Sequence, residues 1–293
     1  MRRFIPTLCL LPLLACGTTG SEDNSKDSQP APQAPAGTFS ALSYNVYGLP
    51  SFVAGGDTGE RMKQIGPLIS VFDVVGVQED FIDDNHALLA DACTLTTRTR
   101  FADMLTGKVY GSGLATFSSM PLVQHEGLHY STCHGLAGNG SDCFASKGIL
   151  FNRLQVAKGA ELDLYTTHLD ASGSPGDEEA RKVQVGEALA FIKKNSEGRA
   201  VIWLGDFNLR PNDPPDKPLL DKIVAETGMK TACDALTCGE PNHIDRIYFR
   251  SGLGLELEAS GWTNEEHFLD EAGEDLSDHP PISATFSWKS TAP

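Results

Sequence analysis

The chain of 293 residues contains 40% hydrophobic residues, which is enough for one large domain with a sizeable core. Its 39 Asp and Glu residues outnumber its 23 Lys and Arg residues, for a net charge of −16. This acidity disfavours binding to DNA or to an anionic membrane unless a local patch or bound cations intervene, and its simplest interpretation is solubility.

The first fifteen residues have the pattern of an export leader. Arg2 and Arg3 precede an apolar stretch over residues 4–14 that is too short to span a bilayer. The stretch ends in Leu-Leu-Ala-Cys-Gly, which resembles a bacterial lipobox. This resemblance implies that residues 1–15 are a lipoprotein signal peptide and that Cys16 is acylated; the alternative is an ordinary signal peptide with a chance cysteine. We therefore expect an exported protein, lipid-anchored to a bacterial membrane at the outer membrane or the cell surface.

Residues 16–37 consist mainly of small and polar residues and prolines without hydrophobic periodicity, and this composition predicts a flexible tether. No second segment of this kind interrupts the rest of the chain. Residues 38–290 are therefore expected to form a single domain.

Within this domain, apolar and β-branched runs alternate with helical patterns. Strands are predicted over 38–47, 73–78, 114–117, 122–130, 148–154, 161–168, 200–204, 244–249, 253–259 and 281–288. Helices are predicted over 61–71, 83–92 and 219–226, and another starts at Ser174-Pro175, where acidic residues follow the cap and the proline. Since strands outnumber helices and the two are interspersed, we expect an α/β fold: a four-layer sandwich of two packed mixed β-sheets flanked by helices.

The cysteines of the domain suit an oxidising compartment. Four of them form two close pairs that predict local disulfides: Cys133 with Cys143, and Cys233 with Cys238. Cys93 is left over and is interpreted as a buried thiol. The alternative for the first pair, a zinc site that includes His134, lacks close Cys-x-x-Cys spacing.

Acidic, amide and histidine side chains gather at the ends of the buried strands. The strand at 200–204 runs into Gly-Asp-Phe-Asn, where extended backbone would point Asp206 and Asn208 to one side and Phe207 into the core. Alone, an Asp-x-Asn sequence is more often a turn device. However, Asn45, Gln78-Glu79 and His168 end three further strands, and Ser-Asp-His at 277–279 precedes the last one. A shared site explains this repetition better than separate capping roles.

Six short motifs, in this order, resemble those of the endonuclease/exonuclease/phosphatase superfamily, which includes deoxyribonucleases, abasic-site endonucleases, inositol polyphosphate 5-phosphatases and neutral sphingomyelinases. They are Ser-Tyr-Asn-Val around Asn45, Val-Gln-Glu ending at Glu79, Thr-Thr-His-Leu around His168, Gly-Asp-Phe-Asn at 205–208, Ile-Asp-Arg-Ile at 244–247 and Ser-Asp-His at 277–279. The resemblance covers about residues 38–288 and implies a phosphoesterase that depends on a divalent metal.

The resemblance also implies a metal site. Glu79 is expected to bind Mg²⁺, with Mn²⁺ as a possible substitute, and Asn45 and Asp278 are expected near or in the metal's coordination shell. Mg²⁺ prefers hard oxygen ligands and keeps several waters, so one or two carboxylates suffice.

The remaining matched residues would act on the water and the phosphate. Asp245 would hold the ring of His279, and His279 together with Asp206 would orient and deprotonate the attacking water. Which of the two accepts the proton stays open at this point. Asn208 and His168 would form hydrogen bonds to the non-bridging phosphoryl oxygens.

The substrate is less well defined. Tyr-Asn-Val-Tyr-Gly-Leu-Pro at 44–50, and Arg181 with Gln184, look most like neutral sphingomyelinases. Lys147-Gly148 also resembles that branch, although a lysine that protects an edge strand is an equal interpretation. The segments 203–210 and 241–247 are similar to inositol polyphosphate 5-phosphatases, but Ile244 stands where those enzymes usually carry Cys.

We therefore expect a sphingomyelinase-like phosphodiesterase that acts on a phospholipid headgroup. One alternative is a secreted nuclease or an inositol-phosphate phosphatase, and another is a surface-binding lipoprotein without catalysis. No basic-aromatic track for nucleic acid is seen in the sequence, which lowers the odds of a nuclease. The chain is expected to be a monomer that contacts a membrane through its N-terminal lipid.

Overall fold

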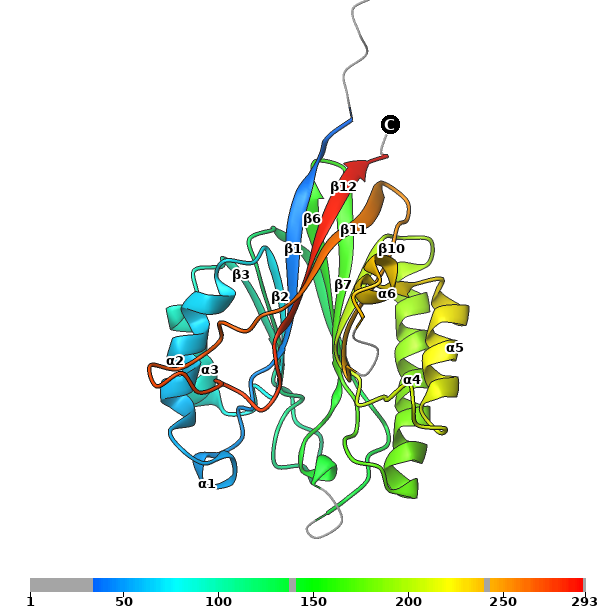
Figure 1. The fold of residues 1–293 in the computed structure, drawn as a ribbon. Helices are drawn as coiled ribbons and strands as arrows, with labels where there is room; N and C mark the ends of the chain where they lie inside the picture. Colours follow the sequence, from blue (N-terminus) through cyan, green and yellow to red (C-terminus); the bar gives the residue numbers. More distant parts are fainter. Residues whose placement is uncertain (1–33, 137–140, 240–242, 292–293) are drawn as a thin grey trace, which may run out of the picture. The chain divides into compact units, whose positions relative to one another are not determined.

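The computed structural model describes residues 34–136, 141–239 and 243–291. The predicted signal peptide, the predicted acylation site Cys16 and most of the predicted tether lie outside these residues. The described chain contains twelve strands in two six-stranded sheets. One sheet has the order β11-β12-β1-β2-β4-β3 and the other β5-β6-β7-β8-β10-β9. Figure 1 shows the two sheets at the centre with helices on either side.

The strands of the first sheet are β1 (Ala36–Asn45), β2 (Val74–Gln78), β3 (Thr97–Phe101), β4 (Leu114–Ser118), β11 (Leu255–Asn264) and β12 (Ile282–Ser290). Those of the second are β5 (Leu122–His129), β6 (Gly148–Ala157), β7 (Ala160–His168), β8 (Val201–Asp206), β9 (Lys230–Thr231) and β10 (Asp245–Arg250). The pairs β1–β2 and β7–β8 are parallel and the remaining pairs are antiparallel. Both sheets are therefore mixed, as predicted.

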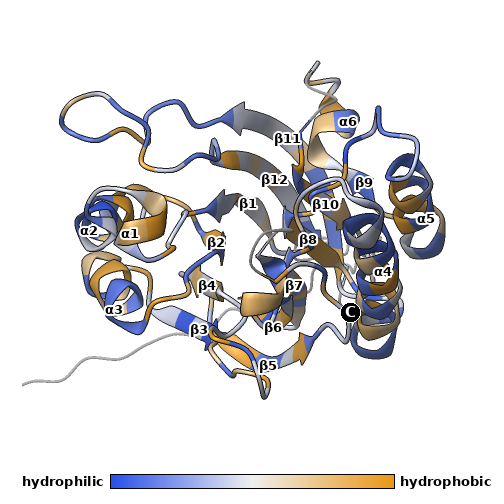
Figure 2. Ribbon diagram, turned by 90° about the horizontal axis from the view of Figure 1, so that it is seen from below, coloured by the Kyte–Doolittle hydropathy of each residue, from blue (hydrophilic) through white to orange (hydrophobic). Residues whose placement is uncertain are grey.

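Four helices cover the outer faces of the two sheets: α2 (Thr58–Ile69), α3 (Asp83–Ala92), α4 (Pro175–Ser196) and α5 (Lys217–Thr227). Two short helices, α1 (Ser51–Ala54) and α6 (Ala232–Leu236), and a 3₁₀ turn, η1, at Asp142–Phe144, lie in the connections. Buried residues of α2 and α3 pack on the first sheet and those of α4 and α5 on the second. Figure 2, a view from below, shows the two sheets between α2 and α3 on one side and α4 and α5 on the other. The predicted four-layer sandwich is confirmed.

A third apolar cluster, between the sheets, holds the sandwich together. It contains side chains from the inner faces of both sheets, among them Phe39, Leu204 and Phe286. At Gly76 the sheets approach so closely that a Cβ atom would lie 2.0 Å from Leu204 Cδ1 and 2.7 Å from Thr166 Oγ1. A larger residue would force the layers apart, because protein interiors are close-packed.

Several short or polar elements depart from the predicted pattern. β3 was not predicted because its sequence, Thr-Arg-Thr-Arg-Phe, is largely polar, and it forms the edge of its sheet. α2 begins three residues earlier than predicted, because Asp57 accepts a hydrogen bond from the backbone N–H of Glu60 and caps it. β1 likewise begins two residues before the expected domain start.

The disulfide predictions are confirmed, since Cys133 is bonded to Cys143 and Cys233 to Cys238. Cys93 is a free, buried thiol. The zinc alternative is wrong because both of its cysteines are used in a disulfide, and the His134 ring instead lies 2.8 Å from Asp177. Among the described residues, no helix is long and apolar enough to cross a membrane.

Candidate active site

The parallel strand pairs bring the predicted polar residues to one end of the sandwich. The register of β1 and β2 places Asn45 opposite Gln78, directly before Glu79. In the other sheet, Asp206 of β8 lies between His168 of β7 and Asp245 of β10. The two parallel strands of each pair end side by side. A hydrogen bond from Asn45 to Asp206 joins the two sets of strand ends into one polar cluster.

Asn45 joins the two sheets at this cluster. Its Nδ2 donates hydrogen bonds to Glu79 Oε1 at 3.2 Å and, across the interface between the sheets, to Asp206 Oδ2 at 3.3 Å. Asn45 is 1% exposed. Its amide therefore fixes the distance between the two carboxylates and shields them from each other.

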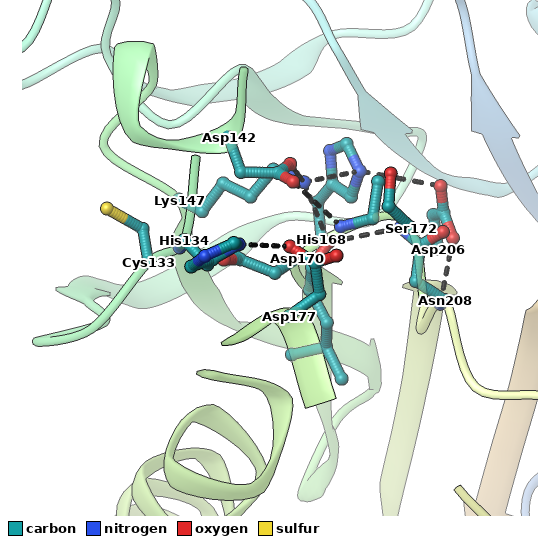
Figure 3. A network of polar contacts seen from close by, with 12 residues as sticks. Cys133, His134, Asp142, Lys147, His168, Asp170, Ser172, Asp177, Asp206 and Asn208 are labelled. Carbon is teal, nitrogen blue, oxygen red and sulfur yellow. Dashed lines mark hydrogen bonds and ion pairs between the residues drawn. The ribbon is translucent and has the colours of Figure 1, made fainter. Parts of the chain in front are cut away.

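The carboxylate of Asp206 is the centre of the cluster. Its Oδ2 lies 3.4 Å from His168 Nε2 and 3.8 Å from His279 Nε2, and its Oδ1 accepts a hydrogen bond from the backbone N–H of Asn208 (Figure 3 shows Asp206 with His168 and Asn208). Burial raises the pKa of Asp206 to about 7, with a further contribution from the nearby charge of Asp245. Asp206 can therefore exchange a proton near neutral pH.

His279 is held by a second carboxylate. Its Nδ1 lies 2.8 Å from Asp245 Oδ2, so this pair orients the ring and leaves Nε2 facing Asp206. Burial alone would lower the pKa of His279, but the hydrogen bond to Asp245 and the charges of Asp245, Asp206 and Asp278 together raise it to about 10. His279 is therefore a cation at neutral pH.

Lys147 supplies a second positive charge to the cluster. It is 5% exposed, its Nζ lies 3.1 Å from His168 Nε2, it donates to the carbonyl of Leu169 at 2.8 Å, and it pairs with Asp142 (Figure 3). Burial, together with the charge of Lys147, holds the pKa of His168 well below its usual value, so its ring is neutral. The interpretation of Lys147 as an edge-strand lysine is wrong, because β6, which follows it, lies inside its sheet.

Asn208 reaches the cluster by a different route from the one expected. β8 ends at Asp206, and Asn208 has a φ of 50°, in the left-handed region, so the alternation of an extended strand does not continue to it. Its side-chain amide donates to the carbonyl of Leu169 at 3.0 Å. Phe207 is buried in the core, as predicted.

Asp278 lies at the rim of the cluster. Its side chain is exposed, and its Oδ1 is 3.4 Å from Ser277 Oγ, which also donates to the carbonyl of Asn45. The charge of Asp278 contributes to raising the pKa of Glu79, after the larger effect of burial. Asp278 is thus near Glu79 in electrostatic terms, without a direct hydrogen bond between their side chains among the described contacts.

The oxygen atoms around Glu79 suit a hard divalent cation. Glu79 Oε2 is buried and has no hydrogen-bond partner among the described residues, while Asn45 Oδ1 accepts only the backbone N–H of Tyr47 at 3.1 Å in the described contacts. Carboxylate and amide oxygens are ligands that Mg²⁺ accepts. A bound cation would satisfy the buried carboxylate oxygen.

A second group of potential ligand atoms, on Asp206, Asp245 and His279, lies within 4.8 Å of one another. In this group the Asp245–His279 hydrogen bond already occupies Nδ1 of the histidine, and the ring is charged. The group is therefore better suited to proton transfer and orientation than to metal binding, and the Glu79 side remains the better fit for the metal.

Sequence reasoning missed the polar network behind the histidine. Asp170, two residues after His168, accepts hydrogen bonds from Gln184 Nε2 at 2.7 Å and from the backbone N–H of His134 at 2.6 Å. Arg181 is buried and donates to the carbonyl oxygens of this loop and to Asp216. Arg181 and Gln184 were noticed only as a family resemblance, and their helical spacing on α4 was the available signal for a shared supporting role.

This two-sheet sandwich, with buried acidic, amide and histidine residues at one end, has the architecture of a phosphoesterase. The profile of the Endonuclease/Exonuclease/phosphatase family matches residues 42–279. The chain belongs to this family.

Two curated relatives are similar to this chain over most of its length. The sphingomyelinases of Mycobacterium bovis and Mycobacterium tuberculosis are 29% identical over 270 residues, which cover 86% of this chain and 53% of theirs. The chain therefore spans about half the length of the curated relatives it matches.

Solved structures share the fold. SmcL has a TM-score of 0.65 at 17% identity, over 86% of this chain and 99% of its own. Sphingomyelinase C from Streptomyces griseocarneus has 0.63 at 18%, over 85% and 99%. A beta toxin variant from Staphylococcus aureus, solved with bound magnesium ions, has 0.63 at 19%, over 85% and 99%.

Proposed function

We propose that this protein hydrolyses a phosphodiester with a water molecule and a divalent metal, Mg²⁺ or Mn²⁺. The observation that carries the proposal is the single cluster in which Asn45 links the carboxylate of Glu79, whose Oε2 has no partner among the described residues, to the carboxylate of Asp206. When bound, the metal would polarise a phosphoryl oxygen and stabilise the charge that develops on it. Glu79, Asn45 and the rim residue Asp278 would hold it.

The two candidates for the proton acceptor differ in their protonation. Asp206 has a pKa near 7 and can take a proton from the attacking water, whereas His279 is already protonated. His279 would therefore stabilise negative charge beside the phosphorus, with Asp245 holding its ring. His168, neutral and supported by Lys147, would contact a phosphoryl oxygen, and Asn208 would hold Asp206 in position through its backbone N–H.

The surroundings of the cluster favour a lipid phosphodiester, with sphingomyelin as the leading candidate. Glu79, Lys147 and His168 line a cavity of about 470 Å³. Its other walls are largely apolar and include Leu49, Pro50, Phe52, Val53, Val109 and Phe144. The short helix α1, largely hydrophobic in Figure 2, carries Phe52 at this cavity with 89% of its surface exposed. Such an exposed aromatic residue beside a reactive centre suits an amphipathic substrate.

Removal of the metal provides the first test. We expect a chromogenic phosphodiester to be hydrolysed with Mg²⁺ or Mn²⁺ and to remain intact after EDTA, with activity restored by excess Mg²⁺. A panel of sphingomyelin, plasmid DNA and inositol polyphosphates then distinguishes the proposed lipid substrate from the nuclease and inositol-phosphatase alternatives. Full activity in EDTA would contradict the metal requirement, and no turnover on any substrate would favour a binding lipoprotein.

The apolar rim provides a second test. Phe52→Ala is expected to lower the rate on sphingomyelin in vesicles by about tenfold, because one Phe side chain contributes about 1.5–3 kcal/mol when it leaves water. The rate on a small soluble phosphodiester should stay within twofold. Leu253→Ala is the matched control, since Leu253 is 77% exposed and does not line the cavity. Equal losses on both substrates would argue against a lipid-docking role.

The proposed setting of the reaction is the outside of a bacterial cell. The basic leader, the apolar stretch and the lipobox-like Cys16 support export and lipid anchoring, and two disulfides are consistent with an oxidising compartment. Incorporation of labelled fatty acid into the wild-type chain and its absence in Cys16→Ser would test the anchor.

A further inference from the structure

Glu79 has a backbone conformation that needs support from its surroundings. Its φ is 60°, in the left-handed region that residues with a side chain rarely adopt. Such a conformation costs on the order of 1–3 kcal/mol and persists only where neighbouring groups fix it. The orientation of the Glu79 carboxylate, and with it the proposed metal site, thus depends on what holds the chain immediately after β2.

The next residue, Asp80, is fixed through its backbone. Its N–H donates to the carbonyl of Gly113 at 2.9 Å, and its carbonyl accepts Arg100 Nη2 at 3.0 Å. Gly113 itself has a φ of 69°, a conformation to which glycine is suited. The two peptides on either side of Asp80 are thereby tied, the first to Gly113 just before β4 and the second to Arg100 of β3.

The side chain of Asp80 adds a second set of ties. Asp80 is fully buried, and its Oδ2 contacts His86 Nδ1 on α3 and lies 3.6 Å from Arg100 Nε. Arg100 also bonds Asp83 at the start of α3, at 2.6 Å. One arginine therefore connects β3, the chain after Glu79 and the first turn of α3.

In the described contacts, Asp80 and Arg100 touch neither Asp206 nor the two site histidines, His168 and His279. A buried carboxylate that only stabilised the fold could lie anywhere in the core, whereas this one is covalently adjacent to the residue with the free carboxylate oxygen. We infer that Asp80 and Arg100 are positioning residues that hold the Glu79 carboxylate in its metal-binding orientation. This inference rests on the proposed metal-dependent function.

The test compares metal binding with stability in the full-length protein. Mn²⁺ is titrated into each variant and followed by electron paramagnetic resonance, while thermal unfolding is measured without metal. Arg100→Ala is expected to raise the Mn²⁺ dissociation constant about 10- to 100-fold, as removal of groups that orient a metal ligand does. Turnover of a soluble phosphodiester should recover to within about threefold of wild type at saturating Mn²⁺.

Three further variants make the result specific. Asp80→Asn keeps the volume of the side chain and should also weaken Mn²⁺ binding, while Arg100→Lys should restore part of the affinity. Arg98→Ala is the matched control, because Arg98 lies on the same strand and bonds the carbonyls of Leu95 and Cys93 instead. It should bind Mn²⁺ as wild type does.

The inference is overturned if Arg100→Ala and Asp80→Asn lose thermal stability but bind Mn²⁺ within twofold of wild type. It is also overturned if Arg98→Ala weakens binding as much as Arg100→Ala. Failure of the proposed function has a different signature: wild type itself then binds no Mn²⁺, or Glu79→Gln binds it with unchanged affinity.

Discussion

Replacement of Asp206 by Asn is expected to lower kcat by about 10³-fold to 10⁴-fold, the upper range for loss of a general base. The amide has nearly the same shape but cannot accept the proton of the attacking water. Because burial already disfavours the charge of Asp206, as its raised pKa shows, the variant should fold and be at least as stable as wild type. Steady-state kinetics at saturating Mg²⁺ and a thermal melt together measure both effects.

The control for this prediction is Asp213→Asn, which changes an exposed aspartate in the loop after β8. It should leave kcat within twofold of wild type. If Asp206→Asn retained more than a tenth of the wild-type kcat, another group would have to accept the proton.

Replacement of Asp163 by Ala is expected to destabilise the protein by about 3 kcal/mol, at the lower end of the range for breaking a buried ion pair. Asp163 is fully buried on β7. Its carboxylate accepts hydrogen bonds from Arg153 Nε at 2.7 Å, from Arg199 Nε at 2.8 Å and from Ser196 Oγ at 2.6 Å. Without it, two guanidinium groups lose their shared acceptor. They keep some access to solvent, which limits the loss.

Urea denaturation measures this prediction, and Asp163→Asn, which keeps part of the hydrogen bonding, should lose less stability than Asp163→Ala. The folded Asp163→Ala protein should retain its kcat, because Asp163 is not part of the catalytic cluster. A free energy of unfolding within 1 kcal/mol of wild type would show that the network contributes little.

The end-of-strand pattern could be predicted because it depends on local sequence and sheet geometry. Parallel strands in register carry Asn45 beside Gln78 and His168 beside Asp206, so residues that follow buried strands must meet at the same end. Runs of apolar and β-branched residues indicated these buried strands, and the order of the motifs along the chain indicated the family. The convergence of the site follows from where these strands end.

Other features depend on tertiary contacts that no local pattern encodes. The left-handed backbone at Asn208 accompanies a side-chain hydrogen bond to the distant carbonyl of Leu169, and that at Glu79 precedes the bond from the Asp80 N–H to the carbonyl of Gly113. Strand alternation cannot predict either conformation. β3 is an edge strand whose arginines resemble loop residues until Arg100 is seen to bond Asp80 and Asp83. Likewise, the sequence allowed Lys147 to be interpreted as a lysine on an edge strand. Only the folded chain shows that β5 pairs with β6, the strand that follows Lys147, so that β6 is not an edge strand.

The bond from Asn45 to Asp206 gives this enzyme family member a particular sensitivity. Its reactive groups are divided between two β-sheets, and neither sheet alone contains both carboxylates. A slip between the layers of about 1 Å would separate them while leaving every strand intact, and such a misplacement can cost about 100-fold in rate. Turnover should therefore fall before circular dichroism detects any unfolding, so that loss of activity is the earliest sign that the layers have loosened.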